Sequence, residues 1–193
     1  EPVDILDRDA FEKELNELGS LRAKADAIRT RLAKSINTKY QENPAYYENF
    51  SKRIKEALEL YKARTITEAE YLAKMRDILE DYRTGKSAIA YPNRIRANVH
   101  AQAFYGVLTA IFSNEKLSVE PDFAAEMALD ITTIIEKHSQ VDWTHNLTIH
   151  DRISQDIDDL FYRYQKEMGL VLSFDVIDMI IENVKTVALR RFA

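Results

Sequence analysis

The clearest evidence for the fold lies in residues 146–169, which read NLTIHDRISQDIDDLFYRYQKEMG. Large apolar residues recur there every three or four positions, and this spacing places them along one face of an α-helix. Asn146 is a favourable N-cap, and Gly169 is a favourable residue just beyond a helix end. The pattern therefore predicts an amphipathic helix with one buried face. Its inward residues are Ile149, Ile153, Ile157, Leu160, Phe161 and Tyr164.

The same periodicity recurs along the rest of the chain and predicts six further helices. A capping box at Thr67 and Glu70, a proline at position 121 and a serine at position 173 mark the starts of three of them. Glycine and proline are scarce, with four of each in 193 residues, which favours long helices over a turn-rich β-architecture. The sequence predicts an all-α bundle of about seven helices.

The chain is expected to divide after its first predicted helix. That helix covers about residues 9–36, and Gly19-Ser20 is a point where it bends or breaks. A polar connector follows it. We therefore expect a helical extension at residues 1–39, whose long helix is free to project, and a compact C-terminal helical domain at residues 40–193.

Composition narrows the class of protein. At 193 residues the chain can bury about 70% of its unfolded surface. It has no cysteine, so disulfides and thiolate metal sites are excluded, and this fits a reducing compartment such as the cytoplasm. No apolar run of about 18 residues occurs, so no membrane partner is expected. The sequence starts at Glu1 and not at methionine, and we expect it to be a piece of a longer polypeptide.

Charge is unevenly distributed along the chain, although the net charge is only −5. Residues 22–39 hold six basic residues and one acid, whereas residues 115–159 hold eleven acids and three bases. A basic segment can contact phosphate groups, and an acidic stretch favours a protein partner. The alternative is that the basic residues are scattered, solvated charges. The negative net charge of the whole chain also argues against a dedicated nucleic-acid binder. The candidate DNA-contacting residues are Arg22, Lys24, Arg29, Arg31, Lys34, Lys39, Arg94 and Arg96.

One segment resembles the end of a phosphate-binding loop, namely Gly85-Lys86-Ser87. That loop needs another glycine at position 80, where this chain has glutamate, and it needs a preceding strand where the periodicity predicts a helix. A helix end is the better interpretation. The chain also lacks the His-Glu-x-x-His and Glu-x-x-His patterns of helical metal sites, and its acids at 156, 158 and 159 are interpreted as a solvated face. No metal site is expected.

The single tryptophan, Trp143, allows two interpretations. It stands in the segment Asp142-Trp143-Thr144-His145-Asn146, just before the helix described first. It is either a core anchor that packs this loop onto the bundle, or an exposed side chain that concentrates binding energy for a partner. Asp142 and Asn146 fit a capped loop under both interpretations. Candidate interface or loop-anchor residues are therefore Asp142, Trp143 and Asn146.

Four stretches together carry a resemblance to a known family. They are Asn43–Tyr47, Thr67–Leu72, Asp142–Tyr162 and Leu172–Asp175, followed by an Arg190-Arg191 ending. Together they resemble the C-terminal part of the motor and restriction (R) subunit of type I restriction–modification enzymes. The resemblance covers roughly residues 40–192, and the first 36 residues look like the tail of a preceding helical domain.

The resemblance implies a role inside a larger machine. In that family the R subunit combines a nuclease domain, two helicase-like motor domains, a helical domain and a C-terminal region, and it uses ATP and Mg²⁺ to translocate and cut DNA. The implied partners are the other R-subunit domains, the modification and specificity subunits of the methyltransferase core, and duplex DNA. No Asp-x-Lys, Glu-x-Lys or complete Walker motif occurs here, so no catalytic residue carries over and no cofactor is expected in this segment.

Three hypotheses about function follow from the sequence. The first is a non-catalytic helical module that supports assembly with the methyltransferase core and makes an auxiliary DNA contact. The second is a stand-alone DNA-binding helical module. The third is an independent enzyme, and no catalytic motif in the chain supports this hypothesis.

Overall fold

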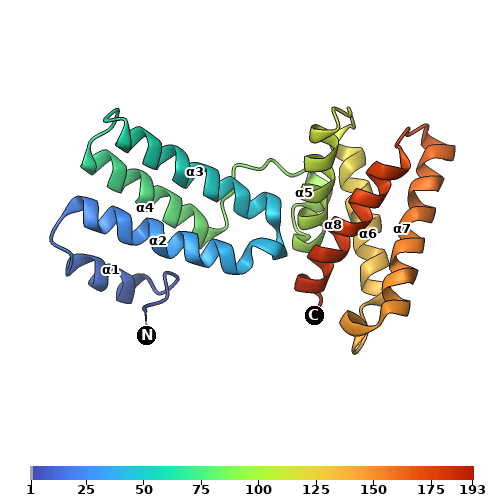
Figure 1. Cartoon of the computed structure of the whole chain (residues 1–193), viewed down its shortest axis with the longest axis horizontal. Coiled ribbons are helices and arrows are strands. Elements are labelled where there is room, and N and C mark those ends of the chain that lie inside the picture. Colours follow the sequence, from blue (N-terminus) through green and yellow to red (C-terminus); the bar gives the residue numbers. More distant parts are fainter. Residues whose placement is uncertain (1) are drawn as a thin grey trace. The chain divides into compact units, whose positions relative to one another are not determined.

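The computed structural model describes residues 2–193 and contains no β-strand in that range, so the expected all-α class is confirmed. Within this described range, eight α-helices follow one another, with three short 3-10 segments between them (Figure 1). The elements are α1 (Arg8–Asn16), α2 (Leu21–Lys39), η1 (Tyr40–Glu42), α3 (Pro44–Lys62), α4 (Glu68–Thr84), η2 (Asn93–Ile95), α5 (Val99–Asn114), α6 (Pro121–His138), η3 (Trp143–His145), α7 (Leu147–Met168) and α8 (Phe174–Arg191).

The capping residues expected from the sequence set several helix ends. The backbone N–H of Glu70 donates to the Thr67 hydroxyl at 3.2 Å, and the Glu70 carboxylate accepts from the Thr67 N–H at 2.7 Å, which completes the capping box of α4. Asn146 caps α7 with its side-chain oxygen. Gly85 and Gly169 end α4 and α7 with φ angles of 72° and 67°, which glycine adopts without steric strain. Gly85 therefore ends a helix, as interpreted.

The long first helix expected at residues 9–36 is two helices, which raises the number from seven to eight. Helix α1 ends at Asn16, and α2 begins after Ser20. The Ser20 hydroxyl accepts a hydrogen bond from the backbone N–H of Ala23 at 3.1 Å, so it serves as the N-cap of a new helix. The Gly19-Ser20 break signal is thus a complete chain reversal and not a bend.

The helices group into two compact units whose boundaries differ from the expected division after residue 39. The first unit runs up to Tyr40 and continues through Tyr46–Ile89, and the second combines Gln41–Ala45 with Ala90–Ala193. The physical reason is the apolar stripe of α2. Ile28 and Leu32 of that stripe share one fully buried core with Met75 of α4, so α2 is an integral part of the first unit and not an extension.

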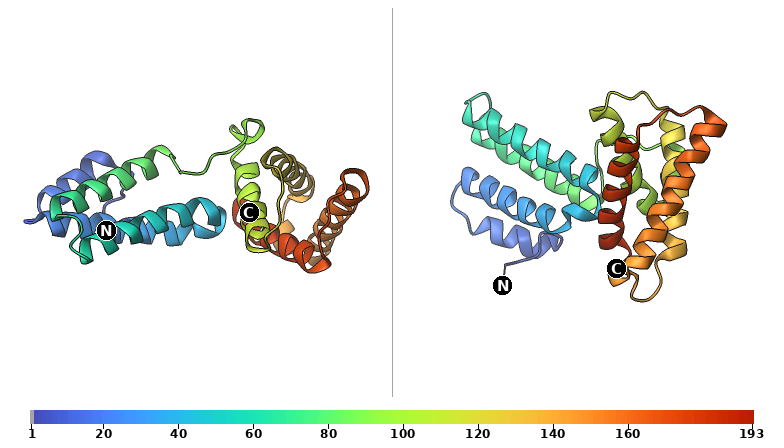
Figure 2. Two further views of the ribbon diagram at one scale, coloured as in Figure 1. Left: turned by 90° about the horizontal axis from the view of Figure 1, so that it is seen from above. Right: turned by 45° about the vertical axis from the view of Figure 1, so that its right-hand side comes forward.

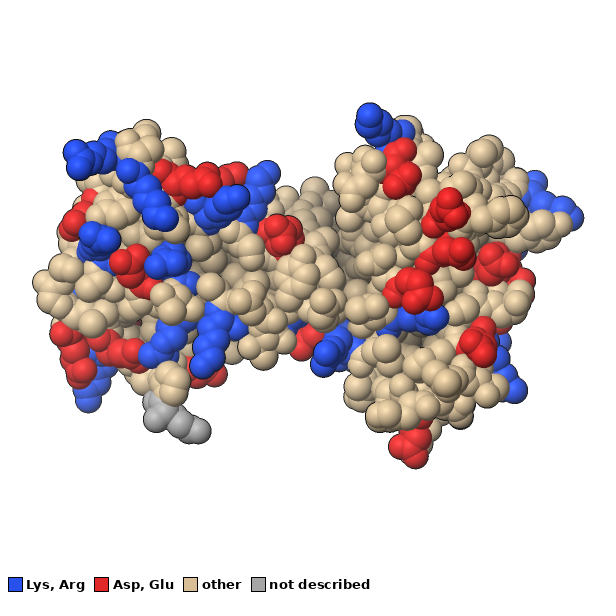
Figure 3. All heavy atoms as spheres, in the orientation of Figure 1, with Lys and Arg blue, Asp and Glu red and all other residues tan. Residues whose placement is uncertain are grey.

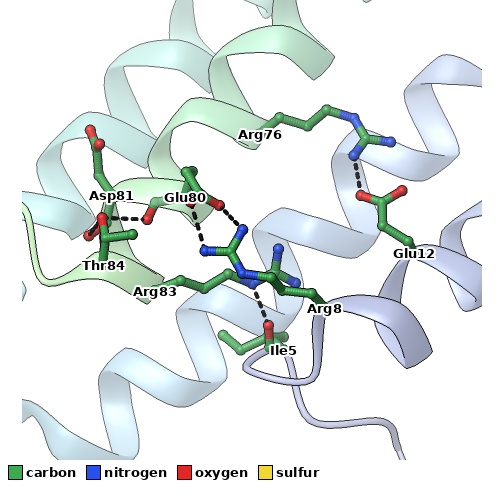
Figure 4. A network of polar contacts seen from close by, with 8 residues as sticks. All are labelled: Ile5, Arg8, Glu12, Arg76, Glu80, Asp81, Arg83 and Thr84. Carbon is green, nitrogen blue, oxygen red and sulfur yellow. Dashed lines mark hydrogen bonds and ion pairs between the residues drawn. The ribbon is translucent and has the colours of Figure 1, made fainter.

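In the first unit, α4 packs along α2, while α3 and α4 form the hairpin expected from the sequence (Figure 1). Helix α1 is held by buried apolar side chains and by a set of ion pairs to α4 (Figure 4). Arg8 makes a two-pronged contact with Glu80 at 2.6 and 2.7 Å, and Arg76 pairs with Glu12. Ion pairs this exposed contribute little. Burial of Phe11 and other apolar residues therefore provides most of the stabilisation.

The second unit is a four-helix bundle of α5–α8. Each helix packs against the next one along the chain, and α8 returns beside α5 to close the ring (Figure 2). The connections are short, which is the usual cause of antiparallel neighbours. Helix α5 is the most buried of the four, and its fully buried residues include Phe104 and Leu108.

Candidate functional site

The basic run of α2 does not form one surface. Arg22 and Arg29 lie on either side of Asp26, with Nε atoms 3.7 and 3.5 Å from its carboxylate oxygens. The hydroxyl of Tyr71 donates to the same carboxylate at 3.3 Å. Asp26 therefore offsets part of the positive charge on this flank of the helix.

The other flank of α2 faces the N-terminal segment of the first unit. The Arg31 guanidinium donates to a backbone carbonyl there at 2.8 Å and pairs with Glu14 at 2.5 Å. Arg31 is therefore a structural tie between helices. Lys24, Lys34 and Lys39 have no carboxylate within ion-pair distance among residues 2–193, and the last two line a hollow of about 230 Å³ beside that segment.

A second basic hollow, of about 420 Å³, lies at the turn between α3 and α4. Arg22 from the start of α2 lines it together with Lys62, the last residue of α3, and Arg64 from the turn. Sequence reasoning missed Lys62 and Arg64, because only the tertiary fold places this turn beside the first turn of α2. Arg64 adopts a left-handed φ of 57° at the end of α3, a position where glycine is usual. Glu68 lines the same hollow but accepts a hydrogen bond from the Tyr61 hydroxyl at 3.3 Å.

Arg94 and Arg96 belong to the second unit, at η2. A guanidinium nitrogen of Arg94 lies 3.9 Å from the carboxylate of Glu126 on α6, and Arg96 is exposed. Neither residue belongs to the hollows of the first unit. Among the six candidate DNA-contacting residues of α2, Arg22, Arg29 and Arg31 pair with carboxylates, whereas Lys24, Lys34 and Lys39 have none within ion-pair distance in the described part of the chain.

The two units differ in charge. The first has 17 basic and 16 acidic residues, whereas the second has 10 basic and 16 acidic residues. Figure 3 shows acidic side chains gathered on the visible face of the second unit and basic side chains spread over that of the first. An anionic ligand is therefore attracted to the first unit more than to the second.

Trp143 lies in the core of the second unit, with 3% of its surface exposed. Its indole Nε1–H donates to the backbone carbonyl of Phe192 at 2.8 Å, and the ring of His150 meets it edge-on. Asp142, just before it, has a left-handed φ of 62°, which turns the chain into η3. The tryptophan therefore pins the loop between α6 and α7 to the end of α8.

Two histidines of the second unit make specific polar contacts. His138 lies 2.7 Å from a carboxylate oxygen of Asp156, and this hydrogen bond holds the pKa of Asp156 below its ordinary value. His100 accepts a hydrogen bond from Arg191 Nε at 3.0 Å through its Nδ1 atom. Burial, together with the positive charge of Arg191, lowers the pKa of His100. The neutral form of His100 is the one that fits this site.

Residues 2–193 contain no group of three or more His, Cys, Asp or Glu side chains placed to hold a metal ion. No helix within the same range has both the length and the apolar character needed to cross a lipid bilayer.

Residues 1–188 match the protein family described as type I restriction enzyme HindI endonuclease subunit-like, C-terminal. The chain belongs to this family. A curated relative, the type I restriction enzyme HindI endonuclease subunit of Haemophilus influenzae, is 25% identical over 127 residues. The aligned part covers 66% of this chain and 12% of the relative, so the chain spans a small fraction of that protein's length. No solved structure matches the chain.

Membership of this endonuclease-subunit family confirms the resemblance drawn from the sequence. The family match covers more of the chain than the resemblance did, because it includes the first 36 residues as well as residues 40–188. Helices α1 and α2 are therefore part of the restriction-enzyme C-terminal domain. This agrees with their burial in the core of the first unit.

Proposed function

We propose that this chain is a non-catalytic helical module that helps to assemble a type I restriction endonuclease subunit with its methyltransferase core. Membership of the C-terminal family of such subunits carries the proposal. In the same proposal, the first unit makes an auxiliary contact with duplex DNA, and the second unit contacts protein. The difference in charge between the two units supports this division of roles.

The electrostatic argument distinguishes the two contacts. Duplex DNA carries a dense line of phosphates, so an excess of carboxylates on the second unit repels it, while lysine and arginine on the first unit attract it. A protein partner with a basic surface has the opposite preference, because it is attracted to the carboxylates of the second unit. The second unit is therefore assigned to the protein partner and the hollow at the α3–α4 turn to the phosphate backbone.

Sedimentation of the 193-residue chain with a purified complex of modification and specificity subunits tests the assembly role. We expect a stable complex, and we expect excess chain to compete with the complete endonuclease subunit and reduce ATP-dependent cleavage. The chain alone is expected to hydrolyse neither ATP nor DNA in the presence of Mg²⁺. Absence of co-sedimentation at micromolar concentrations excludes docking, and a reproducible rate from the chain alone excludes the non-catalytic role.

Charge reversal at the α3–α4 turn tests the DNA contact. The double variant Lys62→Glu and Arg64→Glu is expected to weaken binding to a 30-base-pair duplex at low salt. It should also reduce the slope of log affinity against log salt by about 2, because each lost phosphate contact removes about 0.9. Fluorescence anisotropy at several salt concentrations measures both effects.

The matched control reverses the same number of positive charges at another place on α3. Lys52 and Lys55 are highly exposed and pair within the helix with Glu56 and Glu59 at 4.0 Å. Glutamate at both lysines alters net charge by the same amount, away from the hollow. If control and test variants lose equal affinity, the contact is non-specific and the hollow is not the site. Tight binding by the unmodified chain at physiological salt, without other subunits, favours a stand-alone DNA-binding module instead.

A further inference from the structure

The turn between α7 and α8 exposes three large apolar side chains within seven residues. Met168 is 52% exposed, Val171 is 84% exposed and Phe174 is 82% exposed. Exposed apolar residues are common singly, whereas three of them within one short turn indicate a contact surface. A phenylalanine this exposed is unusual, because aromatic side chains are the strongest contributors to burial.

The turn is held in one conformation by buried neighbours. Leu172 and Val176 are only 7% and 5% exposed and belong to the core of the second unit. Gln165 donates through Nε2 to the carbonyl of Leu172 at 3.0 Å, and Ser173 caps α8. The exposed side chains are therefore presented on a fixed backbone, which reduces the conformational entropy lost on binding.

The rim of this group is acidic. Glu167, Asp175 and Asp178 are exposed, and none of them lies within ion-pair distance of a basic residue among residues 2–193. Lys166 is the basic residue nearest in the chain, and its ammonium group lies 5.1 Å from the centroid of the Tyr162 ring. Carboxylates without partners around an apolar group disfavour a phosphate backbone and favour a basic protein surface.

We propose that Met168, Val171 and Phe174, with their acidic rim, form a docking surface for a protein that presents an apolar pocket bordered by lysine and arginine. We refer to these residues as the α7–α8 surface. The proposal rests on the assembly role proposed above, and it identifies the surface through which the chain meets the methyltransferase core. Phe174 fills the pocket, and the carboxylates at 167, 175 and 178 set the orientation.

The variant Phe174→Asp tests this surface. Phe174 is the first residue of α8, where an aspartate is favourable for the helix, so the variant is expected to fold normally. Loss of a central aromatic contact should weaken binding to the modification–specificity complex by about 30-fold or more. Isothermal titration calorimetry measures the affinity, and circular dichroism verifies the fold. Phe174→Ala is a second variant that adds no charge and should weaken binding in the same direction.

Leu147→Asp provides the matched control. Leu147 is 75% exposed and is the first residue of α7 after its Asn146 cap, so this substitution also replaces an exposed apolar side chain by aspartate at the first position of a helix. It lies at the opposite end of α7 from the α7–α8 surface. We expect normal affinity from this variant.

The outcomes separate this surface from the assembly role. If the unmodified chain binds the complex and Phe174→Asp binds equally well, the α7–α8 surface is wrong and the assembly role stands. If the unmodified chain does not bind, the assembly role itself fails. Equal losses in Phe174→Asp and Leu147→Asp contradict a local surface. A loss of duplex DNA binding in Phe174→Asp, with protein binding unchanged, assigns the surface to DNA and overturns the proposal.

Discussion

Replacing Trp143 by alanine is expected to lower the free energy of unfolding by about 3–5 kcal/mol, the range for removing a buried large aromatic side chain. The indole is almost fully buried, and its N–H is bonded to the carbonyl of Phe192, so alanine leaves both a cavity and an unpaired backbone acceptor. Denaturant unfolding followed by far-ultraviolet circular dichroism measures the change, since the variant has no tryptophan fluorescence.

The variant Trp143→Phe separates the contribution of volume from that of the hydrogen bond. It keeps an aromatic ring in the site but has no donor for Phe192, so a smaller loss of about 1–3 kcal/mol is expected. Both variants should bind partners normally when measured well below their unfolding transitions. Unchanged stability combined with impaired partner binding in Trp143→Ala contradicts the loop-anchor role and supports the exposed hot-spot interpretation instead.

Replacing Gly106 by alanine is expected to destabilise the second unit by up to about 2 kcal/mol, although alanine is the better helix former. A Cβ atom on Gly106 would lie 2.7 Å from the Cβ of Ala45, which belongs to the same unit. Neither atom is the end of a flexible side chain, so the backbone must shift, at a cost of about 1–3 kcal/mol. The gain in helix propensity, about 1 kcal/mol, offsets only part of this. Thermal unfolding and calorimetry measure the result.

The double variant Gly106→Ala with Ala45→Gly exchanges the two residues across the contact and restores space for one methyl group. It should be more stable than the sum of the single variants by about 0.5–3 kcal/mol. Gly19→Ala is the control, because no atom lies within 4 Å of the added Cβ and its φ angle is not in the left-handed region. It should be neutral or slightly stabilising. Additive effects of the two single substitutions at 45 and 106 rule out the close approach.

Local signals in the sequence predicted the helices well. The capping box at Thr67, Pro121 at the start of α6 and Asn146 at the start of α7 all stand where the structure begins a helix. Each acts through backbone groups within one turn of chain, so it needs no knowledge of the rest of the fold. The break at Gly19-Ser20 was visible in the same way, but its extent was not.

The candidate site was predictable only in part. The sequence identified Arg22 as a candidate phosphate contact, but Lys62 and Arg64 lie some forty residues away in the chain and line the same hollow only because of the α3–α4 turn. The sequence left open whether the basic residues of α2 form one surface or are scattered charges. In the structure Asp26, on α2 itself, pairs with Arg22 and Arg29, and Glu14 of α1 pairs with Arg31. Counting charges along a sequence does not reveal which carboxylates from other helices, such as that of Glu14, the fold places beside a basic side chain.

The sequence by itself determined the all-helical class, most helix ends and, through short motifs, the family. Those properties depend on periodicity and on contacts within a few residues, which every segment carries with it. The tertiary structure alone decided that α2 belongs to the first core, that Trp143 is buried and that Gly106 needs to lack a side chain. An apolar stripe can pack against any other stripe, and only the three-dimensional arrangement of the helices selects its neighbour.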